Sequence, residues 1–389
     1  MPSHPGLHAT ASEIVPTEAA RRPRTSRGAG QLPEGERPTE ADAPRPAVQP
    51  AAATLDRCRS LVEPALRKAV RGLHPGPRRI ASHAFGWCET DGTPSARGGG
   101  KGVRPALVVL GAEAVGAPAD VAVPGAVAIE LIHTFSLMHD DIMDGDGSRR
   151  HRDSAWKAFG TGPALLAGDA LFALGVRTLA EVGGDRGGEA VRHLTVMLGE
   201  LVHGQADDEL FESRPWTGPQ AVGIAEYRAM ADRKTGALLG CAAAIGPVLA
   251  GAPRRLTYAL AQAGREWGLA FQAVDDVLGI WGDPAVTGKP VHSDLRRAKK
   301  TLPVLGALAM DPSLGPRLDQ LIGADTPPDD ARLRQAADLI ERAGGRAYAL
   351  RDARSRVAAA RDQLRTVPLA APCVDELVAL SELFVDRRV

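Results

Sequence analysis

The sequence predicts an all-α protein, with one helical domain preceded by a disordered tail. From Leu55 onward, apolar residues recur at the three- and four-residue spacing of helices, and runs of strict two-residue alternation are absent. Clusters of Gly and Pro divide this body into roughly ten helices. The expected breaks lie at 74–77, 91–100, 117–118, 183–188, 214–219 and 324–328.

The N-terminal segment differs in composition from the rest of the chain. Residues 1–52 are rich in Pro, Ala, Glu, Arg and Thr, and the first aromatic residue is Phe85. Such a segment buries too little apolar surface to fold, so we expect a disordered extension that is either a spacer or a segment bound by a partner. Residues 53–389 are expected to form one domain, because the motifs described below are spread over all of it.

Charge and cysteine usage narrow the class of protein. The chain balances 47 Lys and Arg against 47 Asp and Glu, so it has no general attraction for nucleic acid and must bind anions through locally placed side chains. The four cysteines are scattered without zinc-like spacing, and the chain begins without the pattern of a secretory signal. These features favour a protein of the reducing cytoplasm.

One uncharged stretch, 235–253, approaches the length of a membrane span. It consists mostly of Ala and Gly and contains Pro247, a composition that is weakly hydrophobic for a bilayer but suits close packing between helices. We therefore expect a buried helix and no transmembrane segment.

The segment 126–144, AVAIELIHTFSLMHDDIMD, is mostly apolar but carries a polar stripe. His133, Ser136, Asp140 and Asp144 share one helix face, opposite an apolar stripe that includes Leu131. A polar stripe on so apolar a helix is expected to face the protein interior. Desolvation and mutual repulsion of the Asp140, Asp141 and Asp144 carboxylates would cost free energy there unless cations neutralised them. Hard oxygen ligands without a Cys or His cluster indicate Mg²⁺.

A second apolar helix repeats this pattern. The segment 268–283, GLAFQAVDDVLGIWGD, places Gln272, Asp275 and Asp276 about one turn apart. Isolated aspartates of this kind are typical of solvated helix ends, but two such clusters on separate apolar helices predict a metal site that clamps a diphosphate between facing helices.

Basic residues lie at turns where a polyanion could be held. Arg can bind phosphate oxygens in bidentate fashion, so together these side chains could hold two diphosphates. The chain has neither a Walker-type nor a Rossmann-type glycine motif, which argues against nucleotide binding. The basic side chains are Lys101, Arg104, Arg149, Arg150, Lys234, Lys289, Lys299 and Lys300.

With these motifs in place, the chain resembles the polyprenyl synthetase family, the trans-type head-to-tail isoprenyl diphosphate synthases. The resemblance covers nearly all of the helical body, in the family's order and spacing. It runs through GGKGVRP, IHTFSLMHDDIMDGDGSRR, LLAGDALF, GQADD, DRKTGALLG, FQAVDDVLGIWGD, TGKPVHSDL and KKTLP. It implies an isoprenoid synthase-type helical bundle around a central cavity, and a homodimer.

The resemblance also implies roles for individual residues. Isopentenyl diphosphate and an allylic diphosphate would be the substrates, joined by Mg²⁺-assisted ionisation with three ions in each active site. The two aspartate motifs and Lys234 are expected to take part in catalysis. The Mg²⁺ ions are expected to be bound by Asp140 and Asp144 of the first motif and by Asp275 of the second. The catalytic set is thus Asp140, Asp141, Asp144, Lys234, Asp275 and Asp276. Isopentenyl diphosphate would be bound by Lys101, Arg104, His133 and Arg150, and the allylic diphosphate by Arg149, Lys234, Thr235, Gln272, Lys289 and Lys299.

The chain departs from the family pattern at a few positions. The third acidic position of the second motif is Gly279, which indicates a reduced set of metal ligands. His151 stands where a glycine is usual after Arg150, and Gly102 replaces the last residue of GGKR. Because Gly102 is not an expected anion contact, its effect on binding should be small.

Product length is expected to depend on Phe135 and Ser136. Phe135 lies five residues before Asp140, about 7.5 Å along a helix with a rise of ~1.5 Å per residue, where its ring could form a floor for the growing chain. Together with the small Ser136 it resembles the pattern of geranylgeranyl diphosphate synthases. Farnesyl diphosphate is the alternative product, and an ordinary core position is the alternative role of Phe135.

Two other functions fit parts of the sequence. A class I terpene cyclase would share the aspartate-rich helix and the all-α fold, but this chain shows FQAVDD in place of that class's second metal motif. A weakly active assembly protein is suggested by Gly279 and the tail, which is similar to the tails of family members loaded into encapsulin-type shells.

Overall fold

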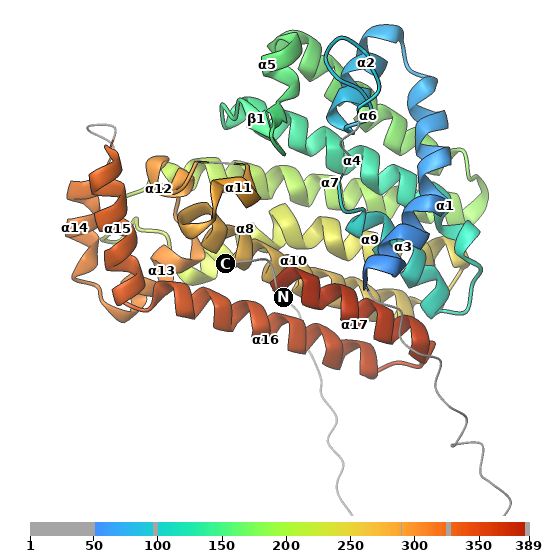
Figure 1. Ribbon diagram of the computed structural model, residues 1–389. Helices are drawn as coiled ribbons and strands as arrows, with labels where there is room; N and C mark the ends of the chain where they lie inside the picture. Colours follow the sequence, from blue (N-terminus) through green and yellow to red (C-terminus); the bar gives the residue numbers. More distant parts are fainter. Residues whose placement is uncertain (1–50, 96–99, 289, 324–327, 386–389) are drawn as a thin grey trace, which may run out of the picture. The chain divides into compact units, whose positions relative to one another are not determined.

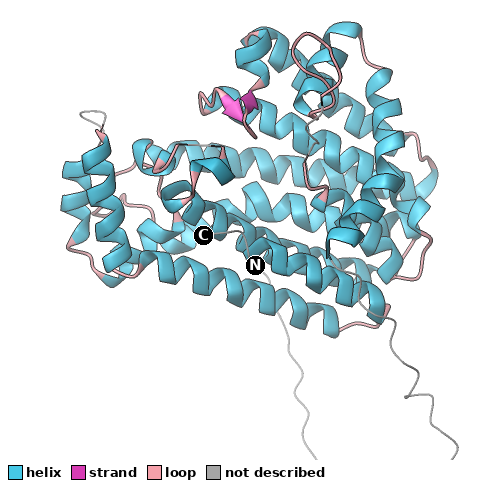
Figure 2. Cartoon of the chain, in the orientation of Figure 1, coloured by secondary structure: helices cyan, strands magenta, loops and turns pink. Residues whose placement is uncertain are grey.

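The computed structural model describes residues 51–95, 100–288, 290–323 and 328–385, and of Val286 and Thr287 only the backbone. Within these ranges the chain is helical apart from its connecting loops and one short pair of strands (Figure 2). The all-α prediction is confirmed. Of the predicted tail, residues 51 and 52 belong to the first helix and residues 1–50 lie outside the described part of the chain.

The elements follow one another along the chain, and Figure 1 labels the α-helices and β1. The first half comprises α1 (Ala51–Arg71), α2 (Pro75–Ala84), α3 (Val103–Ala114), the 3₁₀ turn η2 (Ala119–Ala122), α4 (Val123–Met143), β1 (Ser148–Arg149), β2 (Arg152–Asp153), α5 (Ala155–Phe159), α6 (Thr161–Ala180) and α7 (Gly184–Glu212). The second half comprises α8 (Ile224–Ala231), the π-helical turn η3 (Asp232–Gly236), α9 (Ala237–Ala250), α10 (Arg254–Trp281), α11 (Pro284–Thr287), α12 (Ser293–Arg296), α13 (Leu302–Met310), α14 (Leu314–Ile322), α15 (Asp330–Arg342), α16 (Gly345–Arg365) and α17 (Ala371–Val385).

Two local expectations were wrong. The described ranges hold more helices than the ten expected, because short ones such as α5, α11 and α12 carry too few turns for a periodic pattern. The expected break at 183–188 lies largely inside α7, which begins at Gly184.

The strands β1 and β2 pair antiparallel with Arg149 opposite Arg152, and they are too short for alternation to reveal them.

The turn between β1 and β2 accounts for the departure at His151. Arg150 and His151 have φ angles of 53° and 60°, the left-handed region that a glycine adopts without strain. A glycine is therefore favoured at this position for its backbone, and His151 keeps the same conformation.

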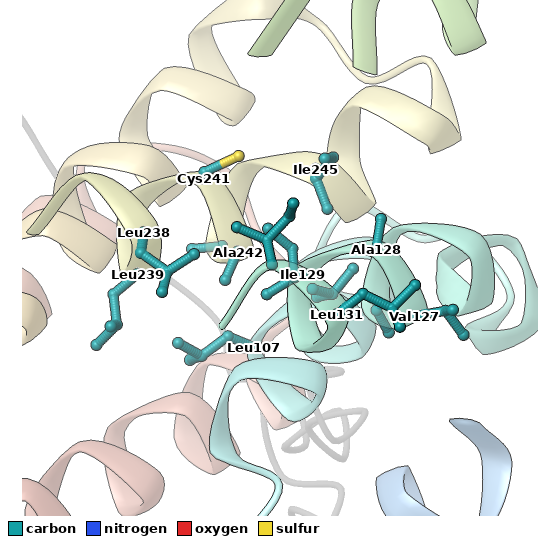
Figure 3. Close-up of a cluster of buried hydrophobic side chains, with 14 of the residues drawn as sticks. Leu107, Val127, Ala128, Ile129, Leu131, Leu238, Leu239, Cys241, Ala242 and Ile245 are labelled. Atoms are coloured by element: carbon teal, nitrogen blue, oxygen red, sulfur yellow. The ribbon is translucent and has the colours of Figure 1, made fainter. Parts of the chain in front are cut away.

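The core forms where α3, α4 and α9 meet (Figure 3). Leu107 of α3, Ile129 and Leu131 of α4, and Leu239 and Ile245 of α9 are almost fully buried there. The buried helix expected within 235–253 is confirmed, since every residue from Ala237 to Leu249 is buried.

Glycines allow α9 to lie directly on α3. A Cβ at Gly246 would strike the carbonyl of Val108, and one at Gly111 would lie 2.6 Å from the carbonyl oxygen of Ala243. Small residues at these positions let the two backbones touch, which explains the Ala- and Gly-rich composition of α9.

Two stretches, Ala119–Met143 and Thr161–Ala180, are long and apolar enough to cross a membrane. The first is 67% buried in the structure, so the apolar character of α4 is accounted for by core packing. The second is 39% buried, which leaves much of α6 facing outward.

Candidate active site

A cavity of about 820 Å³ lies among α4, α7, η3, α9, α10 and the segment 293–301. Asp140 on α4 and Asp275 on α10 both line it, so the two motif helices face one hollow. The other sequence-predicted residues that line it are Lys101, Arg104, His133, Ser136, Asp144, Arg149, Arg150, Lys234, Thr235, Gln272, Asp276 and Lys299. Lys289 lies outside the described residues, so its role stays a prediction.

The polar stripe of α4 forms one wall of the cavity. His133, Ser136, Asp140 and Asp144 all face it, whereas Leu131 on the opposite face is fully buried in the core. Burial raises the pKa of Asp140, while at Asp144 nearby Lys299 and Arg297 outweigh burial and lower the pKa. The two carboxylates are one turn apart yet lie in different electrostatic environments.

Asp141 points away from this cavity. Its carboxylate accepts hydrogen bonds from Arg149, with Nη2 2.6 Å and Nε 2.8 Å from Oδ1, and it borders a smaller hollow behind α4. The expectation that all three aspartates of the first motif line one cavity was therefore wrong. The position of Asp141 makes it a counterion that holds Arg149 at the cavity rim.

Asp276 is likewise held by neighbours. It is 4% exposed, and it accepts hydrogen bonds from Tyr227 Oη (2.5 Å), Gln272 Nε2 (2.9 Å) and the backbone N–H of Leu302 (2.8 Å). Burial raises the pKa of Asp276 to about 7. These bonds join α10 to α8 and α13, so Asp276 braces the helix that carries Asp275.

Lys234 and Thr235 lie on η3, where the chain widens into a π-turn. Such turns often occur at functional sites because they shift the direction of side chains within a helix. Glycines bring the neighbouring helices close: a Cβ at Gly204 of α7 would lie 2.8 Å from Lys234 Cα, and Gly268 of α10 lies against Gly236. Thr235 Oγ1 donates to Gln272 Oε1 at 2.6 Å, which links η3 to α10.

Sequence reasoning missed a network of charges beside the first motif. Asp208 of α7 pairs with Lys234 (2.6 Å) and Lys299 (3.5 Å), and these two cations lower its pKa against the effect of burial. Arg297 pairs with Asp144 (2.7 Å) and Glu212 (2.9 Å). GQADD was a signal for Asp208, because Gln205 and Asp208 lie one turn apart on a cavity-facing side of α7.

Arg104 and Arg150 bring further positive charge to the lining of the cavity. Arg104 lies over the ring of Phe271 at 5.8 Å, and the guanidinium nitrogens of Arg150 would lie 2.9 Å from a Cβ at Gly100. Burial, together with Arg104, Arg150 and Arg149, lowers the pKa of His133 well below its usual value. His133 is therefore a neutral imidazole at pH 7, with one ring nitrogen that can donate a hydrogen bond and one that can accept a hydrogen bond.

The two product-length candidates point in different directions. Ser136 lines the cavity, but Phe135 does not. The ring of Phe135 packs on His139 (centroids 4.7 Å apart) and on Phe172 of α6 (5.4 Å), on the far side of α4.

The donor set fits magnesium. Asp140, Asp144 and Asp275 supply hard oxygen atoms, and no cysteine lines the cavity. Among the described residues, no group of three or more His, Cys, Asp or Glu side chains is arranged to hold an ion by itself. Mg²⁺ typically takes one or two carboxylates and completes its octahedron with water and substrate phosphate, so these residues suit ions shared with a bound diphosphate.

Comparisons with known proteins agree with this arrangement. The family model for polyprenyl synthetase matches residues 87–340. A (2E,6E)-farnesyl diphosphate synthase of Mycobacterium bovis is 44% identical over 338 residues, covering 86% of this chain and 92% of that protein. A geranylgeranyl diphosphate synthase of Mycobacterium tuberculosis is 40% identical over 336 residues, covering 86% and 93%. The crystal structure of a polyprenyl synthetase from Streptomyces coelicolor superimposes with a TM-score of 0.79 at 45% identity, covering 86% of this chain and 99% of that one.

Proposed function

Because this chain belongs to the polyprenyl synthetase family and is a prenyltransferase of the trans-isoprenyl diphosphate synthase type, we propose that it joins isopentenyl diphosphate to an allylic diphosphate and forms mainly geranylgeranyl diphosphate. The observation that carries the proposal is the shared cavity: Asp140 and Asp275 face it from two helices, and several basic side chains also line it. Two diphosphates and one apolar chain could be held there together.

Lys234, Thr235 and Lys299 would hold the allylic diphosphate next to the aspartates. Three Mg²⁺ ions held by Asp140, Asp144 and Asp275 would supply positive charge to the diphosphate as the allylic carbon–oxygen bond breaks. The neighbouring carboxylates raise the pKa of Lys299 despite its burial, so its ammonium stays charged and can contact the leaving oxygens. Gln272 holds Thr235 in place through their hydrogen bond.

Isopentenyl diphosphate would be held by Lys101, Arg104, Arg150 and the neutral His133. Its double bond then attacks the allylic carbon, forming the new carbon–carbon bond, and the resulting cation loses a proton to the released pyrophosphate. Because pyrophosphate accepts the proton, the reaction requires no protein side chain as a base. Leu137, Leu201 and Leu238 line the cavity and would exclude water that could quench the cation.

The proposed product follows from the two residues upstream of Asp140. Ser136 is small and faces the cavity, and Phe135 packs on Phe172 outside it, so neither side chain closes the space beneath the aspartates. Farnesyl diphosphate is the second candidate, because the M. bovis relative that is 44% identical carries that name.

We also propose that the enzyme is a cytoplasmic homodimer. All four cysteines are free thiols, as suits a reducing compartment. The adjacent helices α6 and α7 expose Leu166 (65%), Val196 (65%) and Val202 (58%), an apolar surface that a second copy could cover. Sedimentation of Val202→Glu tests this: the dimer should dissociate, whereas Tyr258→Glu, on an exposed apolar residue of α10, should leave it intact.

We also propose that residues 1–52 are the segment through which the protein binds an encapsulin-type shell. Deleting them separates this role from catalysis. Turnover should persist in the truncated chain, and loss of turnover would contradict the assignment of all chemistry to residues 53–389.

Product analysis tests the proposed reaction. The purified chain would be incubated with isopentenyl diphosphate, Mg²⁺ and dimethylallyl, geranyl or farnesyl diphosphate in turn, and the products identified by mass spectrometry. A C20 diphosphate is expected, and a C15 end product would select the second candidate. Consumption of an allylic diphosphate alone to a hydrocarbon would instead indicate a terpene cyclase.

A further inference from the structure

Arg297 bridges two helix ends next to the first aspartate motif. Its Nη1 lies 2.7 Å from Oδ1 of Asp144, at the end of α4, and its Nη2 donates to Oε1 of Glu212, at the end of α7, at 2.9 Å. The three side chains are 24%, 12% and 25% exposed, so this pairing is partly shielded from water.

The two aspartates of the first motif that are expected to bind metal, Asp140 and Asp144, differ in their ion pairs. Within the part of the chain that the structure describes, Asp140 makes no ion pair, whereas Asp144 contacts Arg297 and lies 3.8 Å from Lys299. A cation that binds Asp144 must therefore displace or share the contact of a guanidinium already there.

The charged side chains around Arg297 pair with one another without any ligand. Three cations, Lys234, Arg297 and Lys299, interleave with three carboxylates, Asp144, Asp208 and Glu212, through distances of 2.6–3.8 Å. Asp146 is a further carboxylate close enough to act on Arg297. A divalent ion entering alone meets the repulsion of these three cations, whereas one that arrives with a diphosphate brings its own negative charge.

We propose that Arg297 is a tethered cation that competes with Mg²⁺ for Asp144, and that Glu212 retains the guanidinium when the ion binds. The inference rests on the proposed function, since it takes Asp144 as a metal ligand. Arg297 is a positioning residue: it keeps Asp144 from binding metal until a diphosphate is present. Glu212 lowers the cost of the exchange, because Arg297 keeps one partly buried carboxylate partner throughout.

Metal affinity, measured apart from turnover, tests the proposal. Mn²⁺ binding to the full chain would be followed by electron paramagnetic resonance, with and without inorganic pyrophosphate. For Arg297→Gln we expect the dissociation constant without pyrophosphate to fall about three- to tenfold, the range for losing one partly buried charge pair. Pyrophosphate should then strengthen Mn²⁺ binding less in this variant than in the wild type.

Two variants serve as controls. Arg296→Gln removes the same charge one residue earlier, where Arg296 pairs with Asp330 at 2.7 Å, and should leave the dissociation constant within about twofold. Glu212→Gln should weaken Mn²⁺ binding, because Arg297 then has only Asp144 as a short-range partner.

Unchanged or weaker binding in a folded Arg297→Gln variant would overturn the proposal while leaving the proposed function intact. If that variant does not fold, Arg297→Lys replaces it: an ammonium cannot bridge two carboxylates as a guanidinium does, so tighter Mn²⁺ binding than in the wild type is again expected, and its absence is decisive. Failure of the wild type to bind Mn²⁺ even with pyrophosphate would overturn both the metal site of the proposed function and the inference built on it.

Discussion

Asp294 fills the space that a side chain at Gly279 would need. A Cβ built on Gly279 would meet the carboxylate of Asp294, with Oδ1 2.8 Å away, and Ser293 Oγ contacts both the carbonyl of Gly279 and Oδ1 of Asp294 at 3.3 Å. Asp294 also lines the cavity. The second motif thus lacks its third aspartate on α10, and a carboxylate from α12 lies in its place.

Restoring the aspartate of the family pattern should therefore impair the enzyme. Gly279→Asp would place one carboxylate on another, and the displacement of Asp294 should lower kcat/KM at least about tenfold, in line with the cost of misplacing a group by ~1 Å. Steady-state kinetics measure this. The double variant with Asp294→Gly makes room for the new side chain and should recover much of the loss; an unimpaired Gly279→Asp would show that Asp294 moves freely.

Asp208 is expected to matter more than its neighbour Asp207. Asp208 pairs with Lys234 and Lys299 in the cavity, whereas Asp207 pairs with Arg233 (3.0 Å) on the partly exposed side of α7. Asp208→Asn should lower kcat/KM about 10- to 100-fold, because two cations lose the group that orients them. Asp207→Asn is the matched control and should stay within about twofold. Equal effects of the two changes would contradict the assignment.

The local part of the site could be predicted from the sequence. The inward faces of α4 and α10 follow from helical periodicity alone, and Asp140 and Asp275 do line one cavity. The same geometry explains Asp141 and Asp276: adjacent helical residues lie about 100° apart, so only one aspartate of each pair can point fully into the cavity. Helical periodicity therefore already separates Asp140 from Asp141 and Asp275 from Asp276.

Other residues of the site lie in a segment without regular secondary-structure periodicity. Asp294 and Arg297 lie in a segment with two left-handed non-glycine residues, His292 (φ 61°) and Ala298 (φ 54°), whose path no periodic pattern predicts. Glu212 lies one turn beyond Asp208 on the same face of α7, but helical spacing alone does not predict that it pairs with Arg297. Such contacts arise only once α7, α10 and α12 are packed together.

Product length should respond to Ser136 and not to Phe135. Ser136→Phe would place a ring inside the cavity, so the main product should shorten from C20 towards C15. Phe135→Ala removes a ring that packs on His139 and Phe172 outside the cavity, so it should cost stability but leave the product unchanged. Mass spectrometry of the products and thermal unfolding of both variants separate the two effects. A longer product from Phe135→Ala would return Phe135 to the role of a floor.

The contribution of Lys300 to the free energy of unfolding should rise with pH in the range where this side chain titrates. Lys300 is 6% exposed, and its ammonium lies 4.2 Å from the ring centre of Trp216 and donates to the carbonyl of Glu212 at 2.8 Å. Burial lowers the pKa of Lys300 to about 8 from its ordinary value of 10.5. Between these values the unfolded chain binds one more proton at this group than the folded chain does, so its contribution to the free energy of unfolding rises with pH over this range.

The difference between wild type and Lys300→Met isolates this contribution, because other titrating groups are common to both chains. Chemical denaturation at a series of pH values should show the wild type gaining stability relative to the variant from about pH 8 to pH 10.5, and a flat difference below pH 8. Lys157→Met is a suitable control, since Lys157 is 53% exposed and its loss should give no such slope. A difference that falls as the pH rises would mean that the folded state favours the charged form of Lys300, and that its contacts with Trp216 and Glu212 outweigh the cost of burial.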